Sequence, residues 1–326
     1  MSSAMTTTTL LEIRDLRVEL QRRDQIYQVL NGVDVTLREG ETLGLVGESG
    51  SGKSMLCRAI LGLLPQPGAS VVSGEILFEG QDLLKLSPRA MAEVRGRKIG
   101  FIPQEPMSSL NPVLSVGEQL KETLREVRSF SGEELQARAI DLLKQVRIPS
   151  PEQRLRSYPH ELSGGMCQRI LAAIALGGEP TLLLADEPTT ALDATIQLQF
   201  LLLLRDIQRQ SGCSILFVTH DFGVVGQICD RVIVMYAGMV VETAPVDVLF
   251  SRPVHPYTKA LIASVPRIAA IGDRLPSIAG QPPHLNDLPQ GCPFAPRCPE
   301  ADGACQNLPP ITYVGKEQQV RCWRSV

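Results

Sequence analysis

A glycine-rich loop over residues 47–54 constrains the fold of this 326-residue chain more than any other feature. Its letters, GESGSGKS, fit the phosphate-loop pattern G-x-x-x-x-G-K-[ST]. An apolar run over residues 42–46 predicts a strand before the loop, and residues 52–63 predict a helix after it. This order indicates a nucleotide site in an α/β fold. The loop residues whose backbone we expect to surround the phosphates are Gly47, Ser49, Gly50 and Gly52.

The last two residues of this loop carry side chains that suit a nucleotide. Lys53 can reach the β- and γ-phosphates, and the hydroxyl of Ser54 can ligate Mg²⁺. The alternative is a glycine-rich turn without function, which the flanking strand and helix disfavour.

An acidic pair, Asp186 and Glu187, follows the apolar residues 182–185. Such a run predicts a buried parallel strand whose end delivers polar side chains to the ligand edge of the sheet. We expect Asp186 to hold Mg²⁺, through water, and Glu187 to orient and deprotonate the attacking water. The alternative is a polar strand end that caps a helix.

A second anion-binding loop is predicted at Ser163-Gly164-Gly165-Met166, which opens an apolar helix. Ser163 suits the N-cap position, and the two glycines leave backbone N–H groups bare at the positive end of the helix. The chain therefore has two places that could bind phosphate groups.

Together these motifs resemble the ATP-binding cassette (ABC) ATPases, over roughly residues 10–250. Residues 162–169 read LSGGMCQR and match the signature of that family, except that Met166 stands where most members have Gln. Further matches, in family order, are the adenine-stacking aromatic Tyr27, the Q-loop Gln104, the D-loop Ala191-Leu192-Asp193 and the switch histidine His220.

The resemblance implies an α/β P-loop NTPase fold: a RecA-like core with an antiparallel β subdomain and a helical subdomain at about residues 105–180. It also implies that two such subunits enclose two ATP molecules, each between one chain's glycine loop and the other chain's Ser163–Gly165. Gln104 would then contact Mg²⁺ or the water, and His220 the γ-phosphate.

Local patterns predict individual elements within that fold. Residues 11–20 alternate as a strand with a slip at Arg14-Asp15, and residues 231–242 indicate a hairpin around Ala237-Gly238. Ser131 and Glu134 form a capping box before a helix to Val146. Further strands are expected near residues 33–37, 74–78, 99–102 and 214–218, and a further helix at 196–208.

The tail, residues 251–326, turns Pro-rich and narrows the resemblance to one branch. Residues 255–261, HPYTKAL, and residues 291–299, GCPFAPRCP, are similar to the segment that follows the cassette in oligopeptide, dipeptide and nickel importer ATPases. Residues 105–112 after Gln104 match the same branch. We therefore expect a cassette over residues 10–250 and a small C-terminal extension over 251–326.

Four of the eight cysteines lie in this extension: Cys292, Cys298, Cys305 and Cys322. In a cytoplasmic chain such clustering favours a metal over disulfides. The spacing is not that of a zinc finger, and some members of the branch carry a [4Fe–4S] cluster on equivalent cysteines, which favours a cluster, with zinc second. Four unliganded thiols are the alternative. The other cysteines are expected to be small buried hydrophobic residues.

Composition limits the location and the partners. The net charge of −3 gives no reason to expect nucleic-acid binding. No apolar run approaches the roughly 18 residues that span a bilayer, and residues 1–9 lack the apolar core of a secretory signal. With the resemblance, this predicts a peripheral protein on the cytoplasmic face of the inner membrane. Its expected partners are a second, non-identical ATPase subunit, two permease subunits and an extracytoplasmic substrate-binding protein.

The expected function is to energise an importer of di- or oligopeptides by hydrolysing ATP; nickel or glutathione-like substrates are alternatives. A soluble ABC protein of DNA repair or translation is a second alternative. It is disfavoured because the chain has one cassette and no sustained heptads between its phosphate motifs. A P-loop GTPase would need an N-K-x-D motif, which the sequence lacks.

Overall fold

The computed structural model describes residues 8–23, 25–127, 130–265, 277–315 and 317–325. These residues fall into two compact units. The helical unit consists of Arg38–Glu41 and Lys85–Val218, and the β-rich unit consists of Thr9–Leu37, Thr42–Leu84 and Thr219–Val326. The boundary near residue 250 stays a prediction.

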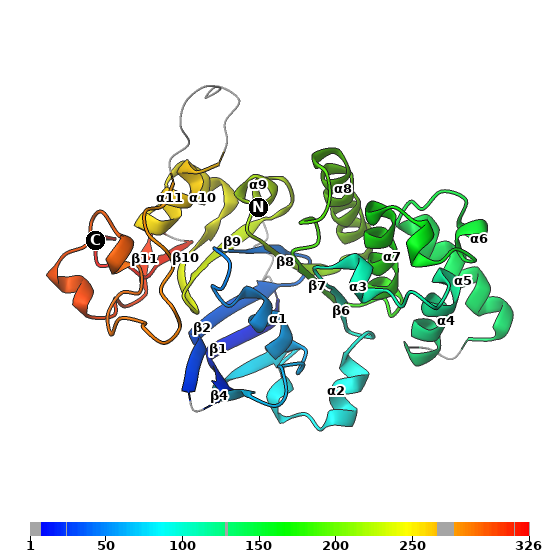
Figure 1. Cartoon of the computed structure of the whole chain (residues 1–326), viewed down its shortest axis with the longest axis horizontal. Helices are drawn as coiled ribbons and strands as arrows, with labels where there is room; N and C mark the ends of the chain where they lie inside the picture. The colour runs from blue at the N-terminus through cyan, green and yellow to red at the C-terminus, as the bar shows by residue number, and fades with distance from the viewer. Residues whose placement is uncertain (1–7, 24, 128–129, 266–276, 316, 326) are drawn as a thin grey trace, which may run out of the picture. The chain divides into compact units, whose positions relative to one another are not determined.

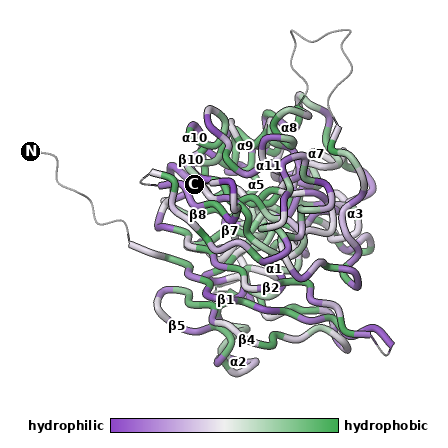
Figure 2. The backbone as a smooth tube through the Cα atoms, turned by 90° about the vertical axis from the view of Figure 1, so that its left-hand side faces the viewer, coloured by the Kyte–Doolittle hydropathy of each residue, from purple (hydrophilic) through white to green (hydrophobic). Residues whose placement is uncertain are grey.

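Three parallel strands organise the helical unit, in the order β8, β7, β6. Leu182 of β7 pairs with Ile99 of β6 on one side and with Ser214 of β8 on the other. Strands β7 and β8 are buried along their whole length, as their unbroken apolar sequence predicts, and they appear largely as hydrophobic segments in Figure 2. The bounds are β6 (Ile99–Ile102), β7 (Leu182–Asp186) and β8 (Ser214–Thr219).

Helices make up most of the remaining helical unit, where α4, α5 and α7 pack against one another (Figure 1). The predicted capping box is confirmed: Ser131 Oγ accepts from the Glu134 N–H, and the Ser131 N–H donates to Glu134 Oε2 at 2.7 Å. The bounds are α2 (Pro88–Val94), α3 (Pro106–Ser109), α4 (Val116–Val127), α5 (Gly132–Gln145), α6 (Pro151–Arg154), η2 (Pro159–Glu161), α7 (Gly164–Leu176) and α8 (Ala194–Ser211).

Helix α8 is longer than the predicted span of residues 196–208 for a local reason. The carboxylate of Asp193 accepts from the N–H groups of Thr195 and Ile196, so the helix begins at Ala194. Gly212 then takes a left-handed conformation and ends the helix. No helix in the described ranges is long and apolar enough to cross a membrane.

The first sheet of the β-rich unit is antiparallel, in the order β2, β1, β4, β5. The predicted slip is confirmed: the β1–β4 register shifts between Arg14 and Arg17, and Asp15 has φ of 40°. The bounds are β1 (Thr9–Arg22), β2 (Gln25–Arg38), β4 (Ala69–Phe78), β5 (Gln81–Asp82) and η1 (Leu83–Lys85).

The second group of strands in this unit has the order β11, β12, β10, β9, β3. Strand β3 runs parallel to β9, with Leu43 opposite Arg231, and β9 and β10 form the predicted hairpin. Strands β11 and β12 come from the tail, where the sequence predicted none. The bounds are β3 (Thr42–Val46), β9 (Arg231–Tyr236), β10 (Met239–Pro245), β11 (Thr312–Val314) and β12 (Gln318–Val320).

The helices of the β-rich unit are short. Helix α1 follows the glycine loop and ends earlier than predicted, because Gly62 takes φ of 61° just beyond it. The bounds are α1 (Lys53–Ile60), α9 (Phe222–Ile228), α10 (Val246–Ser251), α11 (Pro256–Ala263), η4 (Ala295–Arg297) and η5 (Gly303–Gln306).

Candidate functional site

The phosphate loop lies in the β-rich unit between β3 and α1. Two of its glycines are required by geometry. A Cβ on Gly47, which has φ of 155°, would lie 2.2 Å from the Met235 carbonyl oxygen, and a Cβ on Gly52 would lie 2.8 Å from Leu30. The backbone therefore passes close to β9 and β2 at these two glycines. Because glycine has no side chain, the N–H groups of Gly47 and Gly52 are not covered by side chains of their own.

The ammonium group of Lys53 is held by this loop. Lys53 is 4% exposed, and its Nζ donates to the carbonyl oxygens of Gly47 at 2.8 Å and Glu48 at 3.0 Å. Ser54, half-buried, is the next residue of α1. The loop thus holds a positive charge beside a helix N-terminus, which is an arrangement suited to phosphate groups.

Two further predicted residues belong to the β-rich unit. Tyr27 lies half-buried on β2, where its hydroxyl donates to Gln25 at 2.7 Å. His220 is exposed between the end of β8 and α9, whose N-terminus is capped by Asp221. The stacking role of Tyr27 and the switch role of His220 stay predictions.

The acidic pair ends β7 in the helical unit. Asp186 is 5% exposed, and the Glu187 N–H donates to the Val218 carbonyl at 3.0 Å. Glu187 has φ of 45°, which is uncommon for a residue with a side chain and marks local strain of the kind found at functional sites.

The structure brings Gln104 and Glu187 together within this unit. The Gln104 Nε2 donates to Glu187 Oε2 at 3.3 Å, and the Thr190 hydroxyl donates to the same oxygen at 3.1 Å. Thr190 is not among the site residues predicted from the sequence. Its position three residues after Glu187 was the available signal, because a hydroxyl there can bond back to the carboxylate.

The second anion loop has the predicted local structure. Ser163 is the N-cap of α7, and its Oγ accepts from the Met166 N–H at 3.3 Å. Ser163 and Gly164 are exposed, and a Cβ on Gly165 would lie 2.6 Å from Ile196 of α8. The first turn of α7 is therefore open, while its second glycine allows close helix packing. Asp193, the last residue of the predicted D-loop, caps α8 with its carboxylate. Its location at an interface between two subunits stays a prediction.

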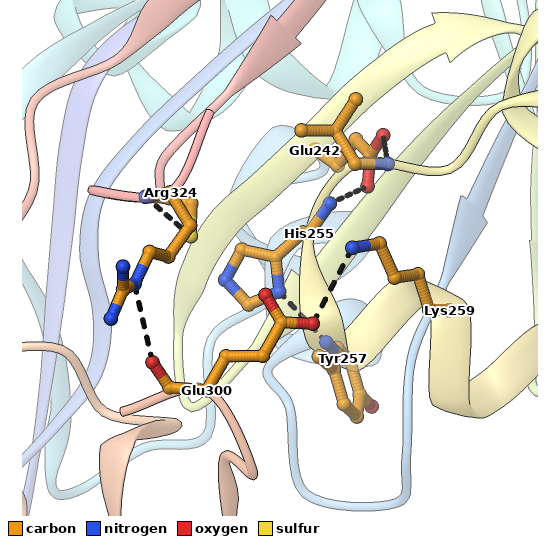
Figure 3. Close-up of polar contacts among 8 residues, drawn as sticks. Glu242, His255, Tyr257, Lys259, Glu300 and Arg324 are labelled. Atoms are coloured by element: carbon orange, nitrogen blue, oxygen red, sulfur yellow. Dashed lines mark hydrogen bonds and ion pairs between the residues drawn. The ribbon is translucent and has the colours of Figure 1, made fainter. Parts of the chain in front are cut away.

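The four cysteines of the extension are near one another in the β-rich unit. The Cys292 N–H donates to the Cys305 carbonyl at 2.9 Å. The pKa of the Cys292 thiol is raised to about 11, mainly by burial and to a smaller extent by the neighbouring Cys305 and Cys322 thiols. Burial likewise raises the pKa of Cys298 and of Cys322, and the Arg324 N–H donates to the Cys322 sulfur at 3.4 Å (Figure 3).

This arrangement does not support the expected iron–sulphur cluster or its zinc alternative. Within the described residues, no three or more His, Cys, Asp or Glu side chains are grouped so that they could hold a metal ion. None of these four cysteines forms a disulfide. The buried character predicted for the other four cysteines is confirmed at Cys57, Cys167, Cys213 and Cys229.

Comparisons with known proteins agree with the motifs. A family described as ABC transporter matches residues 30–190, and one described as oligopeptide/dipeptide transporter, C-terminal region, matches residues 241–305. The oligopeptide transport ATP-binding protein OppD of Bacillus subtilis is 48% identical over 97% of this chain and 89% of its own length. The dipeptide transport ATP-binding protein DppD of the same organism is 46% identical over 96% and 94%.

Solved structures show the same fold. The dimeric post-hydrolysis state of the ATP-binding cassette MJ0796 bound to ADP and Pi has a TM-score of 0.65 and 28% identity, over 72% of this chain and 98% of that one. The fold and the motifs thus define an ABC-type ATPase. The chain belongs to the ABC transporter family, and it carries the C-terminal region of the oligopeptide/dipeptide branch.

Proposed function

We propose that this chain is the ATP-hydrolysing subunit of a binding-protein-dependent importer of di- or oligopeptides. The observation that carries the proposal is the Glu187 carboxylate, held by Gln104 and Thr190 at the end of a buried strand, in a chain that also builds a phosphate loop around Lys53. The peptide substrate is supported by the relatives' names and by the match of the extension.

The phosphate-binding step is assigned to the loop and to α1. Lys53 exchanges its carbonyl partners for the β- and γ-phosphates of ATP, and the loop N–H groups bind the remaining phosphate oxygens. Mg²⁺, when bound, neutralises charge that develops on the phosphates. A preformed cage is not needed, because Mg²⁺ takes one or two carboxylates together with phosphate oxygens and water. Ser54, Asp186 and Gln104 are the residues proposed to hold it.

The hydrolytic step is assigned to Glu187. Its carboxylate accepts a proton from water while the water oxygen forms a bond to the γ-phosphorus and the bond to the β–γ bridging oxygen breaks, giving ADP and phosphate. Gln104 and Thr190 orient the carboxylate, and His220 contacts the γ-phosphate. The proposed reaction is therefore a direct attack by water, with no covalent intermediate on the protein.

The open first turn of α7 supports a composite site. We assign Ser163, Gly164 and Gly165 to the γ-phosphate of an ATP bound by a second ATPase subunit, proposed to be a non-identical relative. Two permease subunits and an extracytoplasmic binding protein complete the complex, with this chain peripheral on the cytoplasmic face of the membrane. The cassette spans residues 10–250 and the extension 251–326.

The substitution Glu187→Gln tests this proposal in the complex assembled with its permeases. It should leave MgATP binding near that of the wild type and lower the turnover number by about 100-fold or more, because only proton acceptance is lost. Glu152→Gln, at an exposed position of the helical unit, is the matched control. Full turnover in Glu187→Gln would refute the mechanism, and turnover that peptide-loaded binding protein does not stimulate would refute the peptide assignment.

The proposed hydrolysis assigns no role to the four tail cysteines, and the described residues show no group of metal ligands there. Elemental analysis of anaerobically purified chain is the direct check. Stoichiometric iron or zinc, lost on substitution of Cys292 by Ser, would contradict this conclusion.

A further inference from the structure

The two signature segments of the C-terminal extension converge on one residue of the phosphate loop. Tyr257, from the segment HPYTKAL, accepts a hydrogen bond from the Glu48 N–H at 2.8 Å. Arg297, from the segment GCPFAPRCP, donates to the Glu48 carboxylate through two nitrogens, at 2.7 Å and 3.0 Å. The family match covers both segments, but the motifs of ATP hydrolysis leave them without a role.

The guanidinium group of Arg297 is fixed on every side. Besides its two-point contact with Glu48, Nε donates to the Ala279 carbonyl at 3.0 Å, and Nη1 donates to the Tyr236 hydroxyl at 3.2 Å. The group also lies over the rings of Tyr236 and Phe294, and the side chain is 5% exposed. Such a part-buried, bidentate pair restricts the geometry of both side chains, and the hydrogen bonds to Glu48 raise the pKa of Arg297.

The hydroxyl of Tyr257 is fixed equally well. Its ring is fully buried, with centroids 4.6 Å from Tyr236 and 5.3 Å from Phe294. The backbone N–H of Tyr257 donates to the ring nitrogen Nδ1 of His255 at 3.0 Å. The backbone N–H of His255 donates to the buried carboxylate of Glu242 at 2.9 Å (Figure 3). Helix α11 therefore presents the hydroxyl to the loop from a firmly attached N-terminus.

Glu48 in turn holds the phosphate-binding lysine. Its carbonyl oxygen accepts a hydrogen bond from Lys53 Nζ at 3.0 Å. We propose that Arg297 and Tyr257 are positioning residues through which the C-terminal extension sets the affinity of the phosphate loop for MgATP. This inference rests on the proposed function, because it takes the loop as the nucleotide site.

The surroundings of the loop explain why it needs such support. A cavity of about 180 Å³ lies beside it, lined by Ser49–Ser51 on the loop and by residues 282–285 of the extension. A glycine-rich segment next to a cavity can adopt other conformations unless it is held. Only the correctly shaped fraction binds ligand, so the apparent dissociation constant rises as that fraction falls.

The test uses the full-length chain and the assembled complex. Arg297→Ala should weaken MgATP binding by about tenfold, since bonds to a charged group are lost, and should raise KM with little change in kcat. Arg297→Lys keeps one charged contact and should recover about half of that loss on a logarithmic scale. Tyr257→Phe removes one neutral hydrogen bond and should weaken binding about threefold.

Arg324→Ala is the matched control. It removes the same charge from the same extension, but Arg324 pairs with Asp302 at half-exposed positions away from Glu48. It should bind MgATP as the wild type does. The double variant Glu48→Gln/Arg297→Ala should bind no more weakly than Arg297→Ala alone, because both changes remove one pair.

Wild-type affinity in Arg297→Ala, or equal losses in Arg297→Ala and Arg324→Ala, would overturn the inference. So would a fall in kcat at unchanged KM, or losses that add fully in the double variant. If Arg297→Ala does not fold, Arg297→Lys and Tyr257→Phe decide between the same outcomes. Failure of the proposed function is distinct, because the wild-type chain itself would then neither bind nor hydrolyse ATP.

Discussion

The phosphate loop of the β-rich unit and the acidic strand end of the helical unit are held by contacts of different strength. Around the loop, Glu48 alone is held by three residues, through contacts of 2.7–3.0 Å. Glu187 accepts hydrogen bonds from Thr190 at 3.1 Å and from Gln104 at 3.3 Å, and Ser163 and Gly164 are exposed. The contacts that hold Glu48 are thus shorter than those that Gln104 and Thr190 make with Glu187, and the start of α7 is open to solvent.

This difference fits an enzyme that must bind nucleotide before it hydrolyses it. A preformed loop lowers the cost of ordering on binding. On the proposed mechanism, a carboxylate held by longer bonds can tighten its contacts when nucleotide binds. The two regions therefore predict separate kinetic effects: changes at the loop should alter KM, and changes around Glu187 should alter kcat.

The largest effect on nucleotide affinity is expected at Gly47, where a Cβ would meet the carbonyl of Met235 on β9. In Gly47→Ala the new Cβ would lie 2.2 Å from the Met235 carbonyl, so loop or strand must move. We expect a cost of about 3 kcal/mol and a roughly 100-fold weaker affinity for MgATP, measured by titration. Gly132→Ala, with nothing within 4 Å, is the control. Near-normal affinity in Gly47→Ala would show that the loop is not preformed.

The features predicted from sequence are those whose signal is local. The glycine loop, the capping box of Ser131 and Glu134, and the slip near Asp15 each depend on residues a few positions apart, and the structure has all three. The interacting residues of each feature are close in the sequence, so their spacing alone specifies the contact between them.

The partners of Glu48 could not be predicted in this way. Tyr257 and Arg297 lie 209 and 249 residues from it, and only the tertiary fold brings them together. The tail strands β11 and β12 were missed because each has three residues, too few for a periodic pattern. The shared ligation predicted from the cysteine spacing has no support in the described residues, because spacing in a Pro-rich segment does not fix where the sulfur atoms point.

A smaller effect, on the stability of the folded chain, is expected at acid pH, because His255 at the N-terminus of α11 is buried. Burial lowers the pKa of His255 to about 3, from an ordinary value of 6.5. Between those values the unfolded chain binds a proton that the folded chain does not, so stability falls as the pH falls below 6.5, by up to about 1.4 kcal/mol per pH unit. Chemical unfolding at a series of pH values measures this slope.

His255→Asn removes the titrating group and keeps a side-chain acceptor for the Tyr257 N–H. Between about pH 3 and pH 6.5 this variant should therefore bind one proton fewer on unfolding, and the slope of the free energy of unfolding against pH should be correspondingly smaller. Equal slopes in the wild type and His255→Asn would mean that this histidine is accessible to protons in the folded chain, and the rigid base of α11 would be disproved.

The smallest effect is expected at Thr190, whose hydroxyl donates to the Glu187 carboxylate at the end of β7. Thr190→Val removes one hydrogen bond to Glu187 and nearly conserves the shape of the side chain. At an exposed position the bond is worth about 1 kcal/mol, so kcat should fall roughly fivefold while KM for ATP stays constant. Thr195→Val, also exposed, is the control. A rise in KM without a fall in kcat would place Thr190 with the binding groups, and the separation between a preformed binding loop and a loosely held base would fail at that residue.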